Sequence, residues 1–319
     1  MLSLLPAAGL CCDHFGGNIA MKRLLHLGGV MAVFGAAVLL SKGERAAGPD
    51  EAARAAAVKL FKSLSDEQKK LALKPFDDKE RYVEMFPGNV RPGLPFDQLT
   101  PEQKALVEEI VKGMTSEYGA ARCLEVAKQT PDNRRYVNFF GNPLADKRFA
   151  WRLAQHHLTL IYAEFATDTP DEFGPILLGG NPVKTLWDAE ENILLELYAS
   201  LSPEEVKAVQ GKGGGTSGQP IGTNGVRIGE LKEKPRALAR RLLEQRLAVF
   251  SADRRKVLEG LIQKDGGADN LRFAVWGEPT RSHRDGGKYH WKIGGATVLC
   301  DWQTQGPNHI HMTVRGRSK

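Results

Sequence analysis

Histidine side chains that could bind a metal ion are concentrated at two places in the sequence. His309 and His311 are two residues apart in a strand-like run, so both side chains project from one face of that strand. His156 and His157 are adjacent at the start of a second apolar run, where neighbouring side chains on a strand point to opposite faces. We therefore expect only one of them to join the C-terminal pair, and we favour His157.

Three or four imidazole groups around one point form a metal site. Zinc, copper and iron all accept imidazole, so the residue types leave the metal open among these three. A metal-bound water has a lowered pKa and can attack a carbonyl or phosphoryl centre while a carboxylate takes its proton. The carboxylates that we expect in this role are Glu190, Glu191 and Asp301. The pattern favours a metal-dependent hydrolase, whereas a redox metal would permit oxygen chemistry instead.

The same histidines have two other interpretations, which the sequence leaves open. A non-catalytic periplasmic protein could use them to bind a metal or a small ligand. In a structural protein the histidines would only form hydrogen bonds. Arg152 and Arg315, each a few residues from a histidine group, are expected either to bind an anionic substrate or to pair with acidic residues.

Helices are predicted where apolar residues recur at helical spacing. Three of these segments begin with Ser or Thr followed three positions later by Glu or Gln, which is typical of a capped helix start. The predicted helices are 50–63, 66–74, 101–115, 118–128, 187–199, 203–210, 234–248 and 252–263.

Strands are predicted where short aromatic or β-branched runs are bounded by Gly, Pro or Asn. These runs are 136–141, 158–165, 271–276, 289–293, 296–302 and 310–314. Helices and strands together predict an α+β fold in which a helical N-terminal half packs on antiparallel β-meanders. We expect a single large domain over residues 49–316.

Two stretches of the sequence resemble each other. Residues 137–143 followed by 149–151 are similar to residues 273–279 followed by 289–291, which indicates a repeated unit of strand, turn and strand. Between them, residues 211–229 are rich in glycine but lack the glycine spacing and the Lys-Ser/Thr of a phosphate-binding loop. We predict a mobile loop there, which could act as a lid.

The first 48 residues have the pattern of an export signal. Met21 is a second possible start, so residues 1–20 are interpreted as an extension. Lys22 and Arg23 precede an apolar run, and a small, polar stretch ends it, as in a signal peptide. We expect a periplasmic or secreted protein that contacts a membrane only if this leader remains as an anchor.

The charge distribution argues against a nucleic-acid partner. The net charge is +6, but positive residues are interleaved with acidic ones and no nucleic-acid-binding motif occurs. The expected partner is a small molecule or a metal ion, and the oligomeric state is left open.

Several motifs follow one another in an order that resembles a known family. They are Ser63-Leu64-Ser65-Asp66-Glu67-Gln68, Phe140-Gly141-Asn142-Pro143, Trp151-Arg152 with His156-His157-Leu158, Gly179-Gly180-Asn181-Pro182, and Asn308-His309-Ile310-His311 with Arg315. Over about residues 52–316 the chain resembles the domain of unknown function 3500 family (DUF3500). The resemblance implies no particular activity, but it supports treating the two histidine groups as one signature. The chain departs from the family pattern at Gln155, in place of Gly, and at Cys300, in place of a Glu, where a thiolate could substitute as a ligand.

Overall fold

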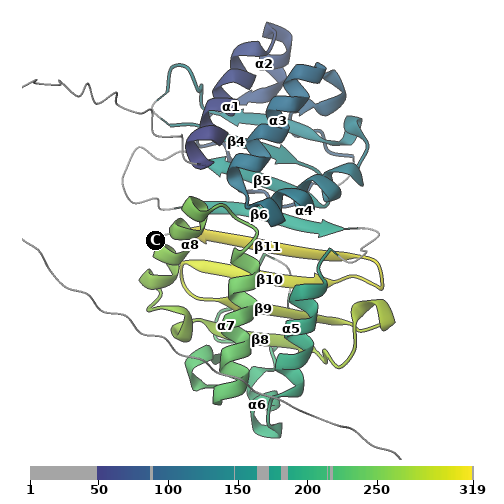
Figure 1. Ribbon diagram of the computed structural model, residues 1–319, viewed down its shortest axis with the longest axis vertical. Coiled ribbons are helices and arrows are strands. Elements are labelled where there is room, and N and C mark those ends of the chain that lie inside the picture. The colour runs from purple at the N-terminus through teal and green to yellow at the C-terminus, as the bar shows by residue number, and fades with distance from the viewer. Residues whose placement is uncertain are drawn as a thin grey trace, which may run out of the picture. The chain divides into compact units, whose positions relative to one another are not determined.

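The protein is an α+β structure in which helices cover one face of a large, mostly antiparallel sheet (Figure 1). The computed structural model describes residues 49–86, 89–146, 148–163, 172–180, 186–213, 215 and 218–317 of the 319-residue chain. The predicted leader, residues 1–48, lies outside the described residues. Among the helices that are described, none is long and apolar enough to cross a membrane.

The first half of the described chain contains helices followed by a meander of strands. Its α-helices are α1 (Pro49–Ser63), α2 (Asp66–Ala72), α3 (Pro101–Met114) and α4 (Glu117–Lys128). Its long strands are β3 (Tyr136–Phe140), β4 (Ala150–Ala154), β5 (Leu158–Ala163) and β6 (Glu172–Gly180). Two short strands, β1 (Leu73–Lys74) and β2 (Leu94–Pro95), pair with β3. The predicted capping boxes are present at Ser65 and Thr100.

The second half repeats this order. Its α-helices are α5 (Asp188–Ala199), α6 (Pro203–Val209), α7 (Glu233–Leu247) and α8 (Ala252–Lys264). Its long strands are β8 (Arg272–Gly277), β9 (Tyr289–Gly294), β10 (Val298–Thr304) and β11 (Ile310–Arg317). The short strand β7 (Val226–Arg227) pairs with β8. The α+β fold and the four helices predicted in this half are confirmed, whereas a helical N-terminal half is not supported, because α5 to α8 make the second half as helical as the first.

The two halves meet at the centre of the sheet. The strand order is β1-β3-β4-β5-β6-β11-β10-β9-β8-β7, so the last strand of each half pairs antiparallel with that of the other. The turns after β4 and β9 also match, because the amide of Gln155 donates to the carbonyl of Leu158 (2.7 Å) and that of Gly295 to the carbonyl of Val298 (2.9 Å). The similar stretches of sequence are thus the hairpins β3–β4 and β8–β9 of two equivalent halves, related by an approximate two-fold axis between β6 and β11.

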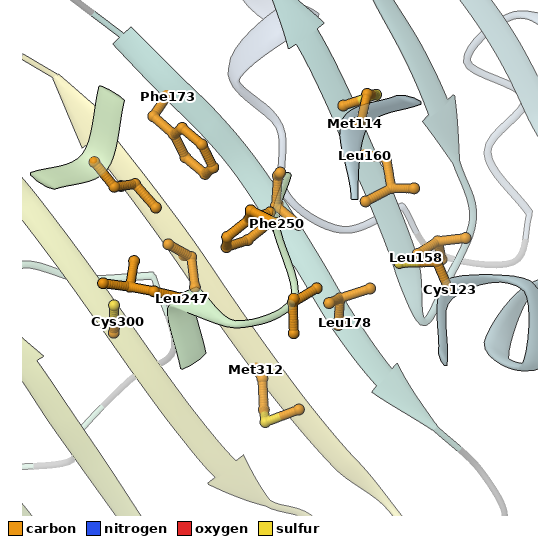
Figure 2. Close-up of a cluster of buried hydrophobic side chains, with 14 of the residues drawn as sticks. Met114, Cys123, Leu158, Leu160, Phe173, Leu178, Leu247, Phe250, Cys300 and Met312 are labelled. Atoms are coloured by element: carbon orange, nitrogen blue, oxygen red, sulfur yellow. The ribbon is translucent and has the colours of Figure 1, made fainter. Parts of the chain in front are cut away.

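Alternate residues of the central strands pack against the helices. Leu178 of β6 lies opposite Met312 of β11, and both belong to the main hydrophobic core with Leu247 and Phe250 (Figure 2). Cys300 of β10 is buried on this same face as a free thiol, and burial raises its pKa to about 12. The suggestion that a Cys300 thiolate could bind the metal was wrong, because the thiol is neutral and lies on the face opposite to His311.

Strand β6 was not predicted from the sequence, although it is one of the two central strands. Gly174 and Pro175 lie at a β-bulge, where the pairing with β11 shifts between Val314 and Gly316. A bulge leaves a residue outside the ladder, so a proline there removes no regular hydrogen bond. Glycine and proline therefore indicated a loop where the chain forms a strand.

Candidate metal centre

The four histidines of the two sequence groups lie together in the structure. His156 and His157 occupy the turn between β4 and β5, His309 directly precedes β11, and His311 is the second residue of β11. One potential ligand atom from each residue lies within 4.8 Å of the corresponding atoms of the other three. We refer to His156, His157, His309 and His311 as the histidine group.

The expectation that only one histidine of the first pair joins the others was wrong, because His156 and His157 both lie in a turn. Alternation of side chains requires extended backbone on both residues, and β5 begins only at Leu158. The ring of His156 is 4.4 Å from that of His157 and 5.5 Å from that of His311, measured between centroids. Both histidines therefore reach the group, and His157 makes the closer contact with His309.

Three of the rings direct the same atom toward one point. His309 Nε2 is 3.0 Å from His157 Nε2 and 3.0 Å from His311 Nε2. A ring nitrogen of neutral imidazole has either one N–H or one in-plane lone pair. His309 Nε2 therefore cannot form a good hydrogen bond with His157 Nε2 and with His311 Nε2 at the same time. Hydrogen bonding alone therefore leaves one of these two contacts unexplained.

A shared metal ion accounts for both contacts. At a metal–nitrogen distance of about 2.05 Å, two nitrogens on one ion are roughly 2.9 Å apart at a right angle and roughly 3.3 Å apart at a tetrahedral angle. The observed 3.0 Å spacings of His309 Nε2 to His157 and His311 fall between these values. The residues present thus fit a transition-metal ion with an all-imidazole ligand set.

The surroundings keep these rings in the neutral form that binds metal. Burial, together with the neighbouring histidines, lowers the pKa of His157 and of His311 to about 3. Burial likewise lowers the pKa of His309, and the nearby His156 adds to this effect. The lone pairs needed for coordination are available at neutral pH because desolvation disfavours imidazolium.

Gly179 of β6 provides the space in which two of the rings meet. It pairs with His311 across the sheet, and its amide donates to the carbonyl of His157 (2.8 Å). A Cβ at this position would lie 2.4 Å from the carbonyl oxygen of Ile310, 3.1 Å from His311 Cδ2 and 3.5 Å from His157 Cδ2. The sequence motif Gly179-Gly180 is thus partly explained, since glycine within a strand often marks a close approach of this kind.

Gln305 contacts the outer nitrogen of one candidate ligand. Its side-chain amide lies 3.4 Å from His311 Nδ1, and its backbone amide donates to the carbonyl of His309 (2.7 Å). The oxygen and nitrogen of a Gln amide are interchangeable by a flip, so Oε1 can accept from Nδ1–H. This orientation leaves the Nε2 lone pair of His311 facing the group, as in other metal sites. Gln305 was not predicted from the sequence as part of the site.

The carboxylates proposed as proton acceptors form other contacts and are not members of the histidine group. Glu191 accepts from Ser282 Oγ (2.7 Å), from the amide of His283 (2.8 Å) and from Tyr289 Oη. Burial opposes its ionisation, but these hydrogen bonds outweigh it and lower the pKa of Glu191 to about 2. Glu191 therefore anchors the segment before β9 as a carboxylate.

The other two carboxylates are also committed elsewhere. Glu190 is fully buried 3.9 Å from the equally buried Arg246, and burial raises its pKa. Asp301 accepts from the amides of Gly218 (2.6 Å) and Thr313 (3.2 Å), and burial raises its pKa as well. These contacts give no support to a catalytic role for either residue.

The two arginines form ion pairs with acidic residues, which was one of the two expected outcomes. Arg152 is buried and donates to Asn138 Oδ1 (2.7 Å), and one of its nitrogens lies 3.4 Å from Glu80 Oε2. Burial lowers its pKa to about 10. Arg315 lies on β11, opposite the bulge in β6, and donates to Glu84 Oε1 (3.0 Å).

A cavity of about 300 Å³ adjoins the histidine group. Its described lining includes His156 and His157 from the turn, Phe86 and Tyr136 as aromatic walls, and the exposed Arg134. A space of this size suits a small molecule. The histidine group therefore borders a space in which such a molecule could bind.

The fold and this group define a class of protein: two equivalent α+β halves whose described residues include an all-histidine candidate metal centre. Residues 46–319 match the model of the family described as "Protein of unknown function (DUF3500)", and the chain belongs to that family. No curated protein and no solved structure matches the chain. The expected family membership is confirmed.

Proposed function

We propose that this protein binds one transition-metal ion through the histidine group. The observation that carries the proposal is the pair of 3.0 Å contacts that His309 Nε2 makes with two other imidazole nitrogens. One shared ion satisfies all three atoms, whereas hydrogen bonds satisfy only two of them. Burial of the rings of His157 and His311 supports the same conclusion, since neutral imidazole is the form that coordinates.

The ligand set narrows the choice of metal. Four imidazoles without a carboxylate or thiolate suit zinc and copper, and iron accepts the same donors. Among the divalent first-row ions, copper(II) binds a given nitrogen site most tightly. Zinc is the next candidate because of its availability to proteins. We expect either ion to saturate the group at a ratio of one per chain.

Hydrolysis of a small molecule is the finer part of the proposal. With His157, His309 and His311 as ligands, a water at the fourth position would have a lowered pKa and could attack a carbonyl or phosphoryl group. His156 is then the neighbouring imidazole able to accept a proton, in place of the carboxylates first considered. The adjoining cavity would hold the substrate.

A second candidate function is metal binding without catalysis. Two observations favour it. The histidine group contains only imidazole side chains among the described residues, without a carboxylate, and His156 is near enough to serve as the fourth ligand. Four protein ligands close a zinc site, which is typical of structural centres. The two candidates differ in whether a position on the ion stays open to the cavity.

Metal analysis of protein purified without an affinity tag tests the first step. We expect about one ion per chain, and loss of that ion in the double variant His309→Ala/His311→Ala with unchanged circular dichroism. The control is His290→Gln, which changes a buried histidine outside the group. Wild-type protein that neither contains nor takes up zinc, copper or iron would disprove the proposal.

Hydrolytic assays separate the two candidates. Metal-loaded protein that cleaves p-nitrophenyl acetate or p-nitrophenyl phosphate, and loses this activity with His156→Ala while retaining metal, would support the hydrolase. Metal retention without turnover of any ester or phosphate tested, combined with lost metal in His156→Ala, would support the closed site.

Export remains part of the proposal on the strength of the signal pattern in residues 21–48. Cell fractionation with N-terminal sequencing of the mature chain tests it. A cytoplasmic protein that retains Met21 would contradict export.

A further inference from the structure

Arg134 provides a positive charge in the cavity beside the histidine group. It lines the cavity and is exposed, and no acidic side chain is among the described lining residues. Asp132, two residues away, pairs with Lys104 (2.8 Å) and with Arg135 instead. Because the described part of the chain gives Arg134 no acidic partner, its guanidinium is available to an anionic ligand, and its fork of N–H donors matches a carboxylate.

A short turn holds Arg134 beside an aromatic wall. The amide of Arg134 donates to the carbonyl of Pro131 (2.9 Å), and Tyr136 Oη donates to the carbonyl of Asn133 (3.1 Å). Tyr136 begins β3 and is 3% exposed, so the turn and the strand together fix its ring. Phe86, which is 5% exposed, is the second aromatic wall. The cavity thus has a cation next to apolar rings, which suits an anionic group on an apolar body.

Gln155 provides a hydrogen-bond acceptor that has no partner. Its side chain is 1% exposed, and the residue lines the same cavity. Gln155 Nε2 donates to the carbonyl of Val126 (3.2 Å), which identifies Oε1 as the other amide atom because a carbonyl only accepts. Within the described structure no group donates to this buried Oε1. Buried polar atoms in proteins are usually paired, so a ligand with an N–H group can supply the missing donor.

We propose that this cavity binds a small organic carboxylate with an N–H donor between the carboxylate and an apolar body, as in an N-acyl amino acid. The carboxylate pairs with Arg134, the N–H donates to Gln155 Oε1, and Phe86 and Tyr136 cover the acyl group. A volume of about 300 Å³ limits this ligand to a small molecule. The inference names a ligand class for the proposed metal centre and in that respect rests on the proposed function, but the contacts with Arg134 and Gln155 involve no metal.

Isothermal titration calorimetry of the full chain with three matched compounds tests this proposal. Hippurate has the carboxylate, the N–H and an aromatic acyl group. Hippuramide lacks the negative charge, and benzoylglycolate has an ester oxygen in place of the N–H. We expect hippurate to bind about tenfold more tightly than hippuramide and about fivefold more tightly than benzoylglycolate, because each analogue loses one of the two hydrogen-bonded contacts. Equal affinity of hippurate and either analogue would overturn the proposal, as would no binding of hippurate at about 10 mM.

Two variants assign each preference to its residue. Arg134→Gln should abolish the preference for hippurate over hippuramide, and Gln155→Met should abolish the preference for hippurate over benzoylglycolate. The carbonyl of Val126 also accepts from the amide of Gln129 (3.0 Å), so it stays paired in Gln155→Met. Circular dichroism checks that both variants fold.

Arg241→Gln is the matched control for Arg134→Gln. Arg241 is an exposed arginine on α7 and is not among the described residues that line the cavity. We expect this variant to keep both preferences. Preferences that persist unchanged in Arg134→Gln and Gln155→Met would place the ligand elsewhere and refute the assignment.

Treatment with a metal chelator separates this proposal from metal binding. We expect the same two preferences before and after the treatment. Their loss on chelation would place the carboxylate on the metal and overturn the assignment to Arg134. A chain that takes up no zinc, copper or iron but shows both preferences would disprove the metal centre and support the ligand site. A chain that takes up metal but binds the three compounds equally would do the opposite.

Discussion

His157 Nε2 and His309 Nε2 lie 3.0 Å apart, although the two residues are separated by 152 positions in the sequence. The sheet brings them together because β5 pairs with β6 and β6 pairs with β11. The β4–β5 turn and the start of β11 therefore lie at the same end of neighbouring strands. The histidine group therefore depends on the joining of the two halves rather than on either half alone.

Metal should stabilise the folded protein through this contact. A ligand that binds only the native state at 100 times its Kd adds about 3 kcal/mol to the free energy of unfolding. We expect zinc or copper to raise the Tm of the wild type by several degrees and to leave the Tm of His157→Ala/His309→Ala unchanged. Differential scanning calorimetry with and without metal measures this. An equal metal-induced shift in the double variant would show that the ion binds elsewhere.

Gly179→Ala should impair the histidine group without removing a ligand. The added methyl group would lie 2.4 Å from the carbonyl oxygen of Ile310, so β6 and β11 must separate locally near His311. We expect at least tenfold weaker metal binding and a destabilisation of about 1–3 kcal/mol, typical of overpacking. Metal titration and urea unfolding measure the two effects.

Gly260→Ala is a suitable control for this substitution, because a Cβ there meets no atom within 4 Å. Alanine also favours the helix more than glycine does, so this control should be neutral or stabilising. Metal affinity that is equal in Gly179→Ala and Gly260→Ala would contradict the spacing argument.

Gln305 should act as a positioning residue for His311. Its amide is 3.4 Å from His311 Nδ1, so Gln305→Ala removes the acceptor that orients the ring. Loss of such an outer partner typically weakens metal binding 10- to 100-fold. Gln305→Glu supplies a carboxylate acceptor and should restore or strengthen binding. A Glu variant as weak as the Ala variant would indicate that Gln305 only shapes the loop.

The helices could be predicted from the sequence because their signals are local. Ser65 and Thr100 cap helices through contacts three residues away, and the apolar spacing of each helix lies within its own segment. Strand order has no such local signal. The central strand β6 was missed because Gly174 and Pro175 lie at a bulge whose partner is in β11, more than one hundred residues later.

The site could be predicted in part for the same reason. Residue type alone identified His309 and His311, but the turn that brings in both His156 and His157 depends on where β5 begins. Glu191 was chosen for its position in the chain, and its partners Ser282 and Tyr289 belong to a distant segment. A glycine within a strand beside a histidine is the signal that could have identified Gly179.

Glu191 should make stability dependent on pH in the acid range. Its pKa is about 2 in the folded protein and 4.5 ordinarily, so between these values the unfolded chain binds a proton that the folded chain does not. Its contribution, about 3 kcal/mol, is therefore complete above pH 4.5 and is lost as the pH falls toward 2. Urea unfolding of the wild type and Glu191→Gln should differ most at pH 6 and progressively less toward pH 3.

An exposed acid provides the control for this experiment. Glu259 on α8 is 52% exposed in its side chain, so Glu259→Gln should change stability little at any of these pH values. A difference between wild type and Glu191→Gln that stays constant from pH 6 to pH 3 would contradict the assigned ionisation.

Glu190 and Arg246 should stabilise the fold only as a pair. Both side chains are 0% exposed and their charged atoms are 3.9 Å apart. Arg246→Met leaves Glu190 buried without its cation, which typically costs about 3–5 kcal/mol. The double variant Glu190→Leu/Arg246→Met removes both charges and should recover most of that loss, because an apolar pair avoids the desolvation penalty. Urea unfolding of the wild type, each single variant and the double variant measures the coupling. If the double variant were as unstable as the sum of the two single variants, the two residues would be independent, and Glu190 would need another role.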